Sequence, residues 1–464
     1  MTAPERHDVI VIGAGPAGEV CAGRLAGEGL DVALVERELV GGECAYWACM
    51  PSKALLRPAQ VLAEAARVPG AREAVSEPLD VGAALARRDH VIHDLDDDAQ
   101  LPWLRDHGIT LVRGPGRLAG ERRVRVDDRL LEATQAVVIA VGSAAAIPPV
   151  PGLREISPWT NRAATTAAAA PKRLTVLGGG AVGCELAQAW ATFGSRVTLV
   201  EAAPALIPRS EPFASALLHE AMDELGIDVH LGAEATAAAR HGDGAGARFT
   251  LTLAGDDHEL TSDELLVAVG RRPLTDDLGL ETIGMRTSAG DTIAVDDRMR
   301  VPSHRDWLYA VGDVNGRALV THAGKYQALV ASATIMNREA SAVWDGPRSP
   351  RVVFTEPQVA AVGLTLDQAL AEGIPARAVD ADPGRTPGAS FVGKGGRSGA
   401  RIVVDDEREV VVGATFVGPE IAESLHAATV AMVGEVPLRR LVHAIPPFPT
   451  RTEVWLRLLE GWAP

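Results

Sequence analysis

The sequence Asp8-Val-Ile-Val-Ile-Gly-Ala-Gly-Pro-Ala-Gly18 joins a short apolar run to a glycine-rich turn. An Ala-rich stretch of helical composition follows, and a second apolar run then ends at the carboxylate of Glu36. Gly13, Gly15 and Gly18 let a pyrophosphate approach the backbone, and the N-terminus of the following helix attracts its charge. Glu36 can accept hydrogen bonds from ribose hydroxyl groups. The order of strand, turn, helix and strand therefore predicts a Rossmann-like dinucleotide-binding unit in an α/β fold.

The chain repeats this arrangement further along. A further apolar run leads into Gly178-Gly-Gly180-Ala-Val-Gly183, and the predicted strand after the next Ala-rich stretch ends at Glu201. The spacing from first glycine to acid is the same as in the first unit. Two such units in one chain predict two bound cofactors, or one cofactor and a dinucleotide substrate.

Three later apolar runs also end at a glycine, namely Gly142, Gly270 and Gly312. Such ends are expected where the strands of a sheet meet a ligand crevice. The Gly-rich segment 241–247 is expected to form a hairpin tip. From about residue 347 the pattern changes to antiparallel strands and helices without a nucleotide fingerprint, which predicts a further domain of α+β type.

Length, composition and charge restrict the class of protein. A chain of 464 residues is too long for a single core and is expected to form about two to four domains. The net charge of −16 argues against nucleic-acid and anionic-membrane partners. No apolar run reaches the roughly 18 residues of a membrane span, and the first residues lack a signal-peptide pattern. We therefore expect a cytoplasmic protein.

Four cysteines are too few for a framework of structural disulfides. Cys21 and Cys184 fall in the predicted helices after the two glycine turns, where each is expected to pack as a small apolar residue. Cys44 and Cys49 form the only closely spaced pair. The pair lacks the companion Cys or His residues of a zinc site, so no metal is expected.

The pair lies in the stretch Gly41-Gly-Glu-Cys-Ala-Tyr-Trp-Ala-Cys-Met-Pro-Ser-Lys53. In a regular α-helix, residues five positions apart have Cα atoms about 8–9 Å apart, whereas a disulfide requires about 7 Å or less. Cys44 and Cys49 therefore either never bond or lie where a helix begins irregularly. The upstream Gly-Gly pair and Pro51 favour the irregular beginning, which would permit a redox-active pair.

Taken together, these motifs resemble those of the class I pyridine nucleotide–disulphide oxidoreductases, the family of dihydrolipoamide dehydrogenase, glutathione reductase and mercuric reductase. The resemblance covers almost the whole chain. It implies two Rossmann-like domains, for FAD and NAD, and a C-terminal α+β domain through which the chain forms a homodimer. The implied segments are 1–144 and 271–346 for FAD binding, 145–270 for NAD(P) binding and 347–464 for dimerisation.

The resemblance also assigns roles to individual residues. Cys49 would be the thiol next to the flavin, and Cys44 would be the outer thiol that attacks an incoming substrate. Lys53 and Glu185 would form an ion pair near the flavin N5 atom. The FAD site would use Gly13, Gly15, Gly18, Glu36, Gly42, Lys53, Gly142 and Asp313, and the nicotinamide dinucleotide site would use Gly178, Gly180, Gly183, Glu201 and Gly270.

The acid at the end of the second unit bears on the choice of nicotinamide cofactor. Glu201 indicates NADH, because a carboxylate accepts from a free 2′-hydroxyl and repels a 2′-phosphate. Arg209 lies close enough in the sequence to keep NADPH as the alternative. The expected cofactors are therefore FAD and NAD(H), with NADP(H) as the second choice.

The chain departs from the family pattern near its C-terminus. In the family a catalytic His opens the last active-site segment, whereas here the matching run is Phe448-Pro-Thr-Arg-Thr-Glu453. Phe448 has no titratable proton and cannot act as a general acid or base, while Glu453 is in register with the former partner of the imidazole. His443 could substitute for the missing His, or it could be an ordinary histidine near the interface. Mercuric reductases also lack this His but normally carry a C-terminal cysteine pair, and no Cys follows Cys184 here.

The expected function is an FAD-dependent NAD(P)H oxidoreductase that passes electrons through Cys44 and Cys49 to a disulphide or another small-molecule acceptor. Two alternatives stay open. One is a quinone-type reductase that acts directly from the flavin, and the other is a redox-sensing flavoprotein without turnover. Tyr46 and Trp47 either stack on an aromatic acceptor or pack against the flavin domain.

Overall fold

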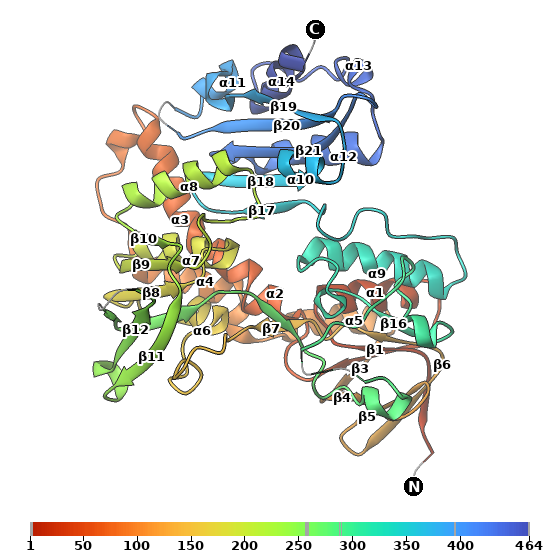
Figure 1. Cartoon of the computed structure of the whole chain (residues 1–464). Coiled ribbons are helices and arrows are strands. Elements are labelled where there is room, and N and C mark those ends of the chain that lie inside the picture. The colour runs from red at the N-terminus through yellow and green to blue at the C-terminus, as the bar shows by residue number, and fades with distance from the viewer. Residues whose placement is uncertain (1–2, 256–258, 287, 289, 394–395, 463–464) are drawn as a thin grey trace. The chain divides into compact units, whose positions relative to one another are not determined.

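The computed structural model describes residues 3–255, 259–286, 288, 290–393 and 396–462 (Figure 1). The chain forms two compact units, each assembled from segments that are not adjacent in sequence. Unit 1 comprises Met1–Pro51, Asp89–Ala145 and Arg271–Ser349. Unit 2 comprises Ser52–Arg88, Ala146–Gly270 and Pro350–Pro464.

Unit 1 is organised on a seven-stranded sheet in the order β3-β2-β1-β6-β5-β4, and β16 also pairs with β6. The pairs β1–β2, β2–β3, β1–β6 and β6–β16 are parallel, whereas β4 and β5 add an antiparallel extension. A separate antiparallel pair joins β7 to β15. The strands are β1 (Glu5–Ile12), β2 (Val32–Glu36), β3 (Thr110–Arg113), β4 (Gly116–Leu118), β5 (Arg123–Val126), β6 (Arg129–Ile139), β7 (Ser143–Ala145), β15 (Arg271–Pro273) and β16 (Leu308–Ala310).

Both faces of this sheet are covered, which explains the continuous apolar runs in its parallel strands. Val9 and Val11 of β1 face a core formed with α1 (Pro16–Gly27) and α9 (Thr321–Ile335), which lie side by side on that face (Figure 1). Ile10 and Ile12 face a second core on the opposite side. The other helices of unit 1 are α2 (Gly42–Tyr46) and α5 (Leu101–Asp106), and α4 (Val81–Val91) ends in it.

Unit 2 contains a parallel sheet in the order β10-β9-β8-β14 and an antiparallel sheet in the order β11-β12-β13. The predicted hairpin tip at 241–247 is confirmed, because β11 and β12 pair antiparallel on either side of it. The elements are α6 (Asn161–Thr166), β8 (Arg173–Leu177), α7 (Ala181–Thr192), β9 (Arg196–Glu201), α8 (Pro212–Glu224), β10 (Asp228–Leu231), β11 (Ala235–His241), β12 (Arg248–Leu253), β13 (Glu259–Ser262) and β14 (Glu264–Val267).

The C-terminal part of unit 2 is a five-stranded antiparallel sheet in the order β17-β18-β21-β20-β19, and the predicted α+β character is confirmed. Its strands are accompanied by short helices (Figure 1). The elements are β17 (Arg351–Val353), β18 (Gln358–Gly363), α10 (Leu366–Ala371), β19 (Ala376–Ala381), α11 (Pro387–Ser390), β20 (Gly399–Asp405), β21 (Val410–Gly418), α12 (Leu425–Val433), α13 (Leu438–Leu441) and α14 (Val454–Trp462).

Residues 52–88 belong to unit 2, although the sequence places them inside the first FAD-binding segment. The physical reason is a shared core. Leu55 and Leu56 of α3 (Cys49–Arg67) and Leu85 of α4 belong to the same apolar cluster as Trp190 of α7. The boundaries of the cofactor-binding domains therefore stay a prediction, because packing units and binding domains need not coincide.

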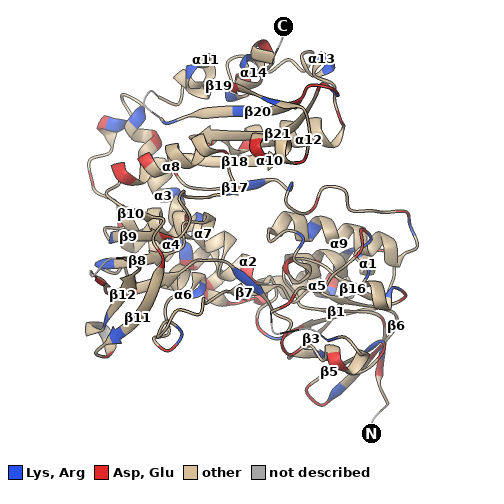
Figure 2. Ribbon diagram, viewed as in Figure 1, with Lys and Arg blue, Asp and Glu red and all other residues tan. Residues whose placement is uncertain are grey.

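Charged residues of both signs are distributed over the elements of both units (Figure 2). Among the described residues, no helix combines the length and apolar character needed to cross a membrane.

Candidate active site

The first glycine turn, in unit 1, is shaped by close backbone approach. Gly13 has a φ of +104°, and a Cβ there would lie 2.5 Å from the carbonyl oxygen of Ala140. A Cβ on Gly18 would lie 1.9 Å from the Gly13 oxygen, so only glycine fits. At Gly15 the same position has nothing within 4 Å, and the backbone faces open space at the N-terminus of α1. Such an open cradle suits a pyrophosphate.

The acid at the end of β2 closes this turn. Glu36 is buried, and its two carboxylate oxygens accept the backbone N–H groups of Ala14 and Glu38, each at 2.7 Å. These bonds fix the carboxylate beside the glycine turn and leave it lone pairs for ribose hydroxyls.

The second turn, in unit 2, repeats this construction closely. Gly178 has a φ of +112°, and a Cβ on Gly183 would lie 1.8 Å from the Gly178 oxygen, whereas a Cβ on Gly180 would meet open space. The Glu201 carboxylate accepts the N–H groups of Gly179 at 2.5 Å and Ala203 at 2.7 Å. The sequence repeat is therefore a repeat of hydrogen-bonded structure as well. Arg209 is exposed.

The two cysteines belong to unit 1 but lie on different helices. Cys44 is in α2, which ends at Tyr46, and Cys49 is the first residue of α3. The irregular beginning that the glycines and proline favour is thus present. Both residues are free thiols. Their side chains form a hydrogen bond, and together with burial and the charge on Cys49 this bond raises the pKa of Cys44 far above its usual range.

Gly42 allows this segment to approach the first glycine turn. Its φ is +58°, and a Cβ there would lie 2.8 Å from the Cα atom of Gly15. The helix that carries Cys44 therefore contacts the proposed pyrophosphate cradle as closely as two backbones permit.

Sequence reasoning missed two residues of α9 that affect the cysteines. The Oγ1 atom of Thr321 lies 3.4 Å from Sγ of Cys49. Thr321 and the charge of Lys325 also oppose the rise in the pKa of Cys44. Both residues lie in the first turns of α9, where the helix dipole favours negative charge. No local motif marks them, because the contact joins segments 272 residues apart.

The ion pair implied for Lys53 and Glu185 is formed within unit 2. Nζ of Lys53 lies 2.7 Å from Oε2 of Glu185, and Oε1 accepts the N–H of Phe354 at 2.9 Å. Lys53 Nζ also lies 4.7 Å from the centre of the Phe354 ring. The carboxylate is nearly inaccessible, with 5% of its side chain exposed, whereas Lys53 is 37% exposed. The catalytic role of the pair stays a prediction.

A polar cluster in unit 1 surrounds Asp313, one of the residues expected to bind FAD. Its Oδ2 accepts the hydroxyl of Ser143 at 2.5 Å. Arg271 donates from Nε to the Ser143 hydroxyl and from Nη2 to the Ser143 carbonyl, both at 2.7 Å. Gly142 immediately precedes Ser143 with a φ of +72°, and Gly270 precedes Arg271 with a φ of +150°. The glycines predicted at strand ends therefore flank side chains that the sequence did not single out.

In the C-terminal segment, Phe448 is 75% exposed and Glu453 is buried. Oε2 of Glu453 accepts the backbone N–H of Gly388 at 3.0 Å, so this carboxylate already has a structural partner. His443 is exposed.

Tyr46, which lies between the two cysteines in the sequence, is buried, and its hydroxyl donates to the carbonyl of Asp96 at 3.4 Å, which places it in the packing of unit 1. Trp47 lies beside it, with 5.8 Å between the ring centres.

Comparison with known proteins adds independent information. Residues 7–333 match the family described as pyridine nucleotide-disulphide oxidoreductase, and residues 349–458 match the dimerisation domain of that family. The dihydrolipoyl dehydrogenase of Thermus scotoductus is 34% identical over 98% of this chain and 97% of its own length. The enzyme of that name from Haloferax volcanii is 31% identical, over 98% and 96%.

Two solved structures show a similar fold at lower identity. LpdA from Mycobacterium tuberculosis aligns with a TM-score of 0.86 at 23% identity, over 99% of this chain and 100% of its own. The HOCl-induced flavoprotein disulfide reductase RclA from Escherichia coli aligns with a TM-score of 0.85 at 24% identity, over 98% and 99%.

Proposed function

The chain belongs to the pyridine nucleotide–disulphide oxidoreductase family, and we propose that it oxidises NADH and reduces a small-molecule acceptor through Cys44 and Cys49. As a member of that family it is an FAD-dependent oxidoreductase with a dimerisation domain. The single observation that carries the thiol route is the Cys44–Cys49 contact, with Thr321 at 3.4 Å from Cys49.

The residues of unit 1 fit FAD. The open backbone at Gly15 and the fixed carboxylate of Glu36 suit an adenosine diphosphate, and Asp313 offers an acceptor for hydroxyl groups. Bound FAD would supply the two-electron relay between a reduced nicotinamide and the thiol pair.

The protein's own residues then set the chemistry of the acceptor. The thiolate of Cys44 would attack one sulfur of a disulphide acceptor and release a thiolate. Cys49 would next displace the second sulfur, and the Cys44–Cys49 disulfide would re-form. Thr321 and the charge of Lys325 oppose the rise in the pKa of Cys44 and so favour its thiolate form. No imidazole is available at position 448 to take or return protons.

Phe448 favours a second candidate, in which the acceptor is a quinone-like molecule reduced without Cys44. An exposed aromatic side chain can contact a flat apolar acceptor, and it can serve no proton transfer. The difference between the two candidates therefore lies in whether turnover requires the thiol pair.

NADH oxidation by the unmodified protein and by Cys44→Ser tests these proposals. The acceptors are lipoamide, glutathione disulphide and a soluble quinone. The thiol route predicts that Cys44→Ser abolishes every disulphide turnover. Quinone reduction that persists in Cys44→Ser supports the second candidate, and disulphide turnover that persists contradicts the first. A protein that binds FAD but turns over with no acceptor would instead be a sensor.

NADH is the proposed donor because the Glu201 carboxylate is fixed by two backbone N–H groups where it would repel a 2′-phosphate. The ratio of kcat/KM for NADH and NADPH tests this. A preference for NADPH would show that Arg209 or another basic residue dominates the pocket.

We propose that the protein is a homodimer formed through the segment 349–458 that matches the dimerisation domain. Exposed apolar side chains occur in this part of unit 2, namely Val430, Val433, Val442, Ile445 and Phe448. Light scattering at working concentration tests the assembly, and an active monomer would contradict it.

A further inference from the structure

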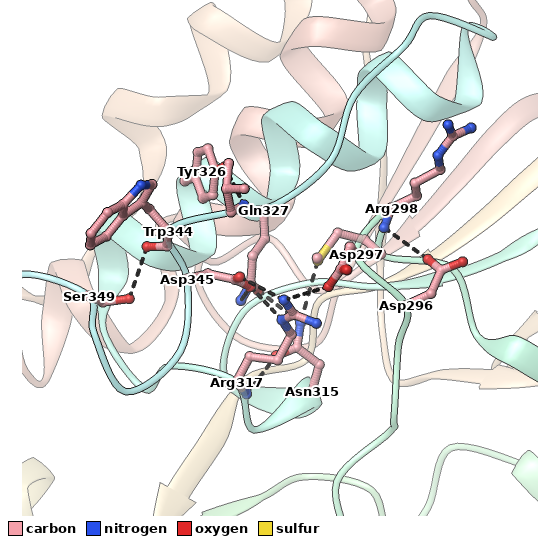
Figure 3. A network of polar contacts seen from close by, with 12 residues as sticks. Asp296, Asp297, Arg298, Asn315, Arg317, Tyr326, Gln327, Trp344, Asp345 and Ser349 are labelled. Carbon is pink, nitrogen blue, oxygen red and sulfur yellow. Dashed lines mark hydrogen bonds and ion pairs between the residues drawn. The ribbon is translucent and has the colours of Figure 1, made fainter. Parts of the chain in front are cut away.

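A network of polar side chains in unit 1 gathers Asn315, Arg317, Gln327 and Asp345 (Figure 3). It lies next to the turn that follows β16, where Gly312 immediately precedes Asp313. None of these four residues is part of a motif discussed above. Their contacts show how the position of Asp313 is maintained.

Gln327 holds the backbone of this turn. Its side chain is fully buried on α9, and its Oε1 atom accepts the N–H of Gly312 at 2.8 Å. The same oxygen accepts Nδ2 of Asn315 at 2.8 Å, and Asn315 Nδ2 also reaches the carbonyl of Ala310 at 3.1 Å. The amide oxygen of Gln327 therefore joins residues on both sides of Asp313.

Asp345 determines which way the Gln327 amide faces. A carboxylate only accepts hydrogen bonds, and Oδ2 of Asp345 accepts Nε2 of Gln327 at 3.0 Å. The amide oxygen must then face Gly312. If the amide were reversed, its NH2 group would meet two donors, the N–H of Gly312 and the NH2 of Asn315.

Arg317 offsets the free-energy cost of burying the Asp345 carboxylate. The side chain of Asp345 is only 1% exposed. Arg317 donates two hydrogen bonds to it, from Nε to Oδ2 at 2.6 Å and from Nη2 to Oδ1 at 2.8 Å. The hydrogen bond to Asp345 raises the pKa of Arg317. The backbone N–H of Arg317 also donates to Oδ1 of Asn315 at 3.0 Å, which returns the network to the turn.

We propose that Asp345 is a positioning residue for the turn at Gly312 and Asp313, and that it acts through the amide of Gln327. Ser143 holds the Asp313 carboxylate, while Asp345 and Gln327 hold its backbone. The inference rests on the proposed role of Asp313 in binding FAD.

The test is the rate at which the holoprotein releases FAD, followed by the recovery of flavin fluorescence. Asp345→Asn can donate as well as accept, so the Gln327 amide is free to reverse. We expect release to become about tenfold faster, the factor that corresponds to one net hydrogen bond. The matched control is Glu28→Gln, which removes an Arg-paired carboxylate from the surface of the same unit. Its release rate should stay near that of the unmodified protein.

A second comparison separates positioning from general loss of structure. The double variant Asp345→Asn with Gln327→Glu reverses the direction of the hydrogen bond between positions 327 and 345. The new carboxylate at position 327 accepts from Gly312, from Asn315 and from the new amide at position 345. It should restore slow release. If Asp345→Asn does not fold, Gln327→Met provides a second test. Methionine has a side chain of similar length but lacks the amide oxygen and the amide NH2, so this variant should also release FAD quickly.

The outcomes distinguish this inference from the proposed function. An unmodified protein that holds no FAD refutes the proposed function. An unmodified protein that holds FAD, with equally slow release from Asp345→Asn or Gln327→Met, refutes the role of Asp345. Fast release that the double variant does not reverse refutes the argument from amide polarity.

Discussion

The Sγ atom of Cys49 lies 3.4 Å from the Oγ1 atom of Thr321, a residue 272 positions later in the chain. The contact brings the N-terminal end of α9 to the thiol pair. Thr321 supplies a hydroxyl that can donate to a thiolate, the helix end supplies partial positive charge, and Lys325 adds a full charge one turn further along. A site that lacks an imidazole at position 448 thus has another means of favouring the thiolate.

Thr321→Val should raise the apparent pKa of the reduced thiol pair by about one unit, because the variant cannot donate to a thiolate. The two thiols titrate together, so the value belongs to the pair. The pH dependence of alkylation by iodoacetamide measures it. Thr321→Ser keeps the hydroxyl and is the control. An unchanged profile in Thr321→Val would show that the hydroxyl does not bond the thiolate.

Glu19 follows the last glycine of the first fingerprint, and burial raises its pKa from the ordinary 4.5 to about 7. Since its pKa is higher in the folded than in the unfolded state, its contribution to the free energy of unfolding falls as the pH rises from about 4.5 to about 7. Glu19→Gln removes this loss. The variant should therefore gain stability at pH 8, by up to about 3 kcal/mol, and much less at pH 5.

Thermal unfolding of both proteins at pH 5 and pH 8 measures this difference. Glu339→Gln, an exposed acid in the same unit, is the control and should follow the unmodified protein at both values. A Glu19→Gln variant whose gain is equal at pH 5 and pH 8 would contradict the raised pKa.

Glu185→Gln keeps an acceptor for the N–H of Phe354 but removes the charge that holds Lys53. If this pair supports transfer from the nicotinamide, reduction by NADH should slow by about tenfold, as expected for the loss of one charge-assisted hydrogen bond. Stopped-flow bleaching of the flavin absorbance measures the step. Glu220→Gln, at an exposed position of the same unit, should leave it unchanged. Equal rates in Glu185→Gln and the unmodified protein would show that the Lys53–Glu185 ion pair has only a structural role.

Phe448→His should create or raise turnover with lipoamide, because it restores a general acid or base where the family has one. The gain could reach about 10²-fold, the lower end of what such catalysis contributes. Phe448 is 75% exposed, so the substitution should not disturb the fold. The hydrogen bond of Glu453 to Gly388 leaves only part of that carboxylate for orienting a new imidazole, which argues against a larger gain.

Steady-state assays with Phe448→His and Phe448→Ala separate the imidazole from simple loss of the ring. The unmodified protein provides the sharper comparison. Strong lipoamide turnover that survives His443→Ala would show that this site does not need an imidazole, and the interpretation of Phe448 would then be wrong.

The sequence alone determined the features that depend on short spacings. Glycines at fixed intervals and an acid at the end of the next strand specify each dinucleotide unit, because the same few residues form both the turn and its contacts. Short Val-rich runs after about residue 347 identified the antiparallel C-terminal sheet. The cysteine pair was visible as well, but whether the helix begins irregularly there was left open until the structure showed the break between α2 and α3.

Tertiary structure alone decided which side chains surround those motifs. Thr321 reaches Cys49, Arg271 reaches Ser143, and Asp345 reaches Gln327, and none of these pairs shares a local pattern. Such contacts depend on which strands neighbour each other in the sheet and which helices cover it. That order is set by the packing of the whole unit, so residues that touch in space carry no fixed spacing in the chain.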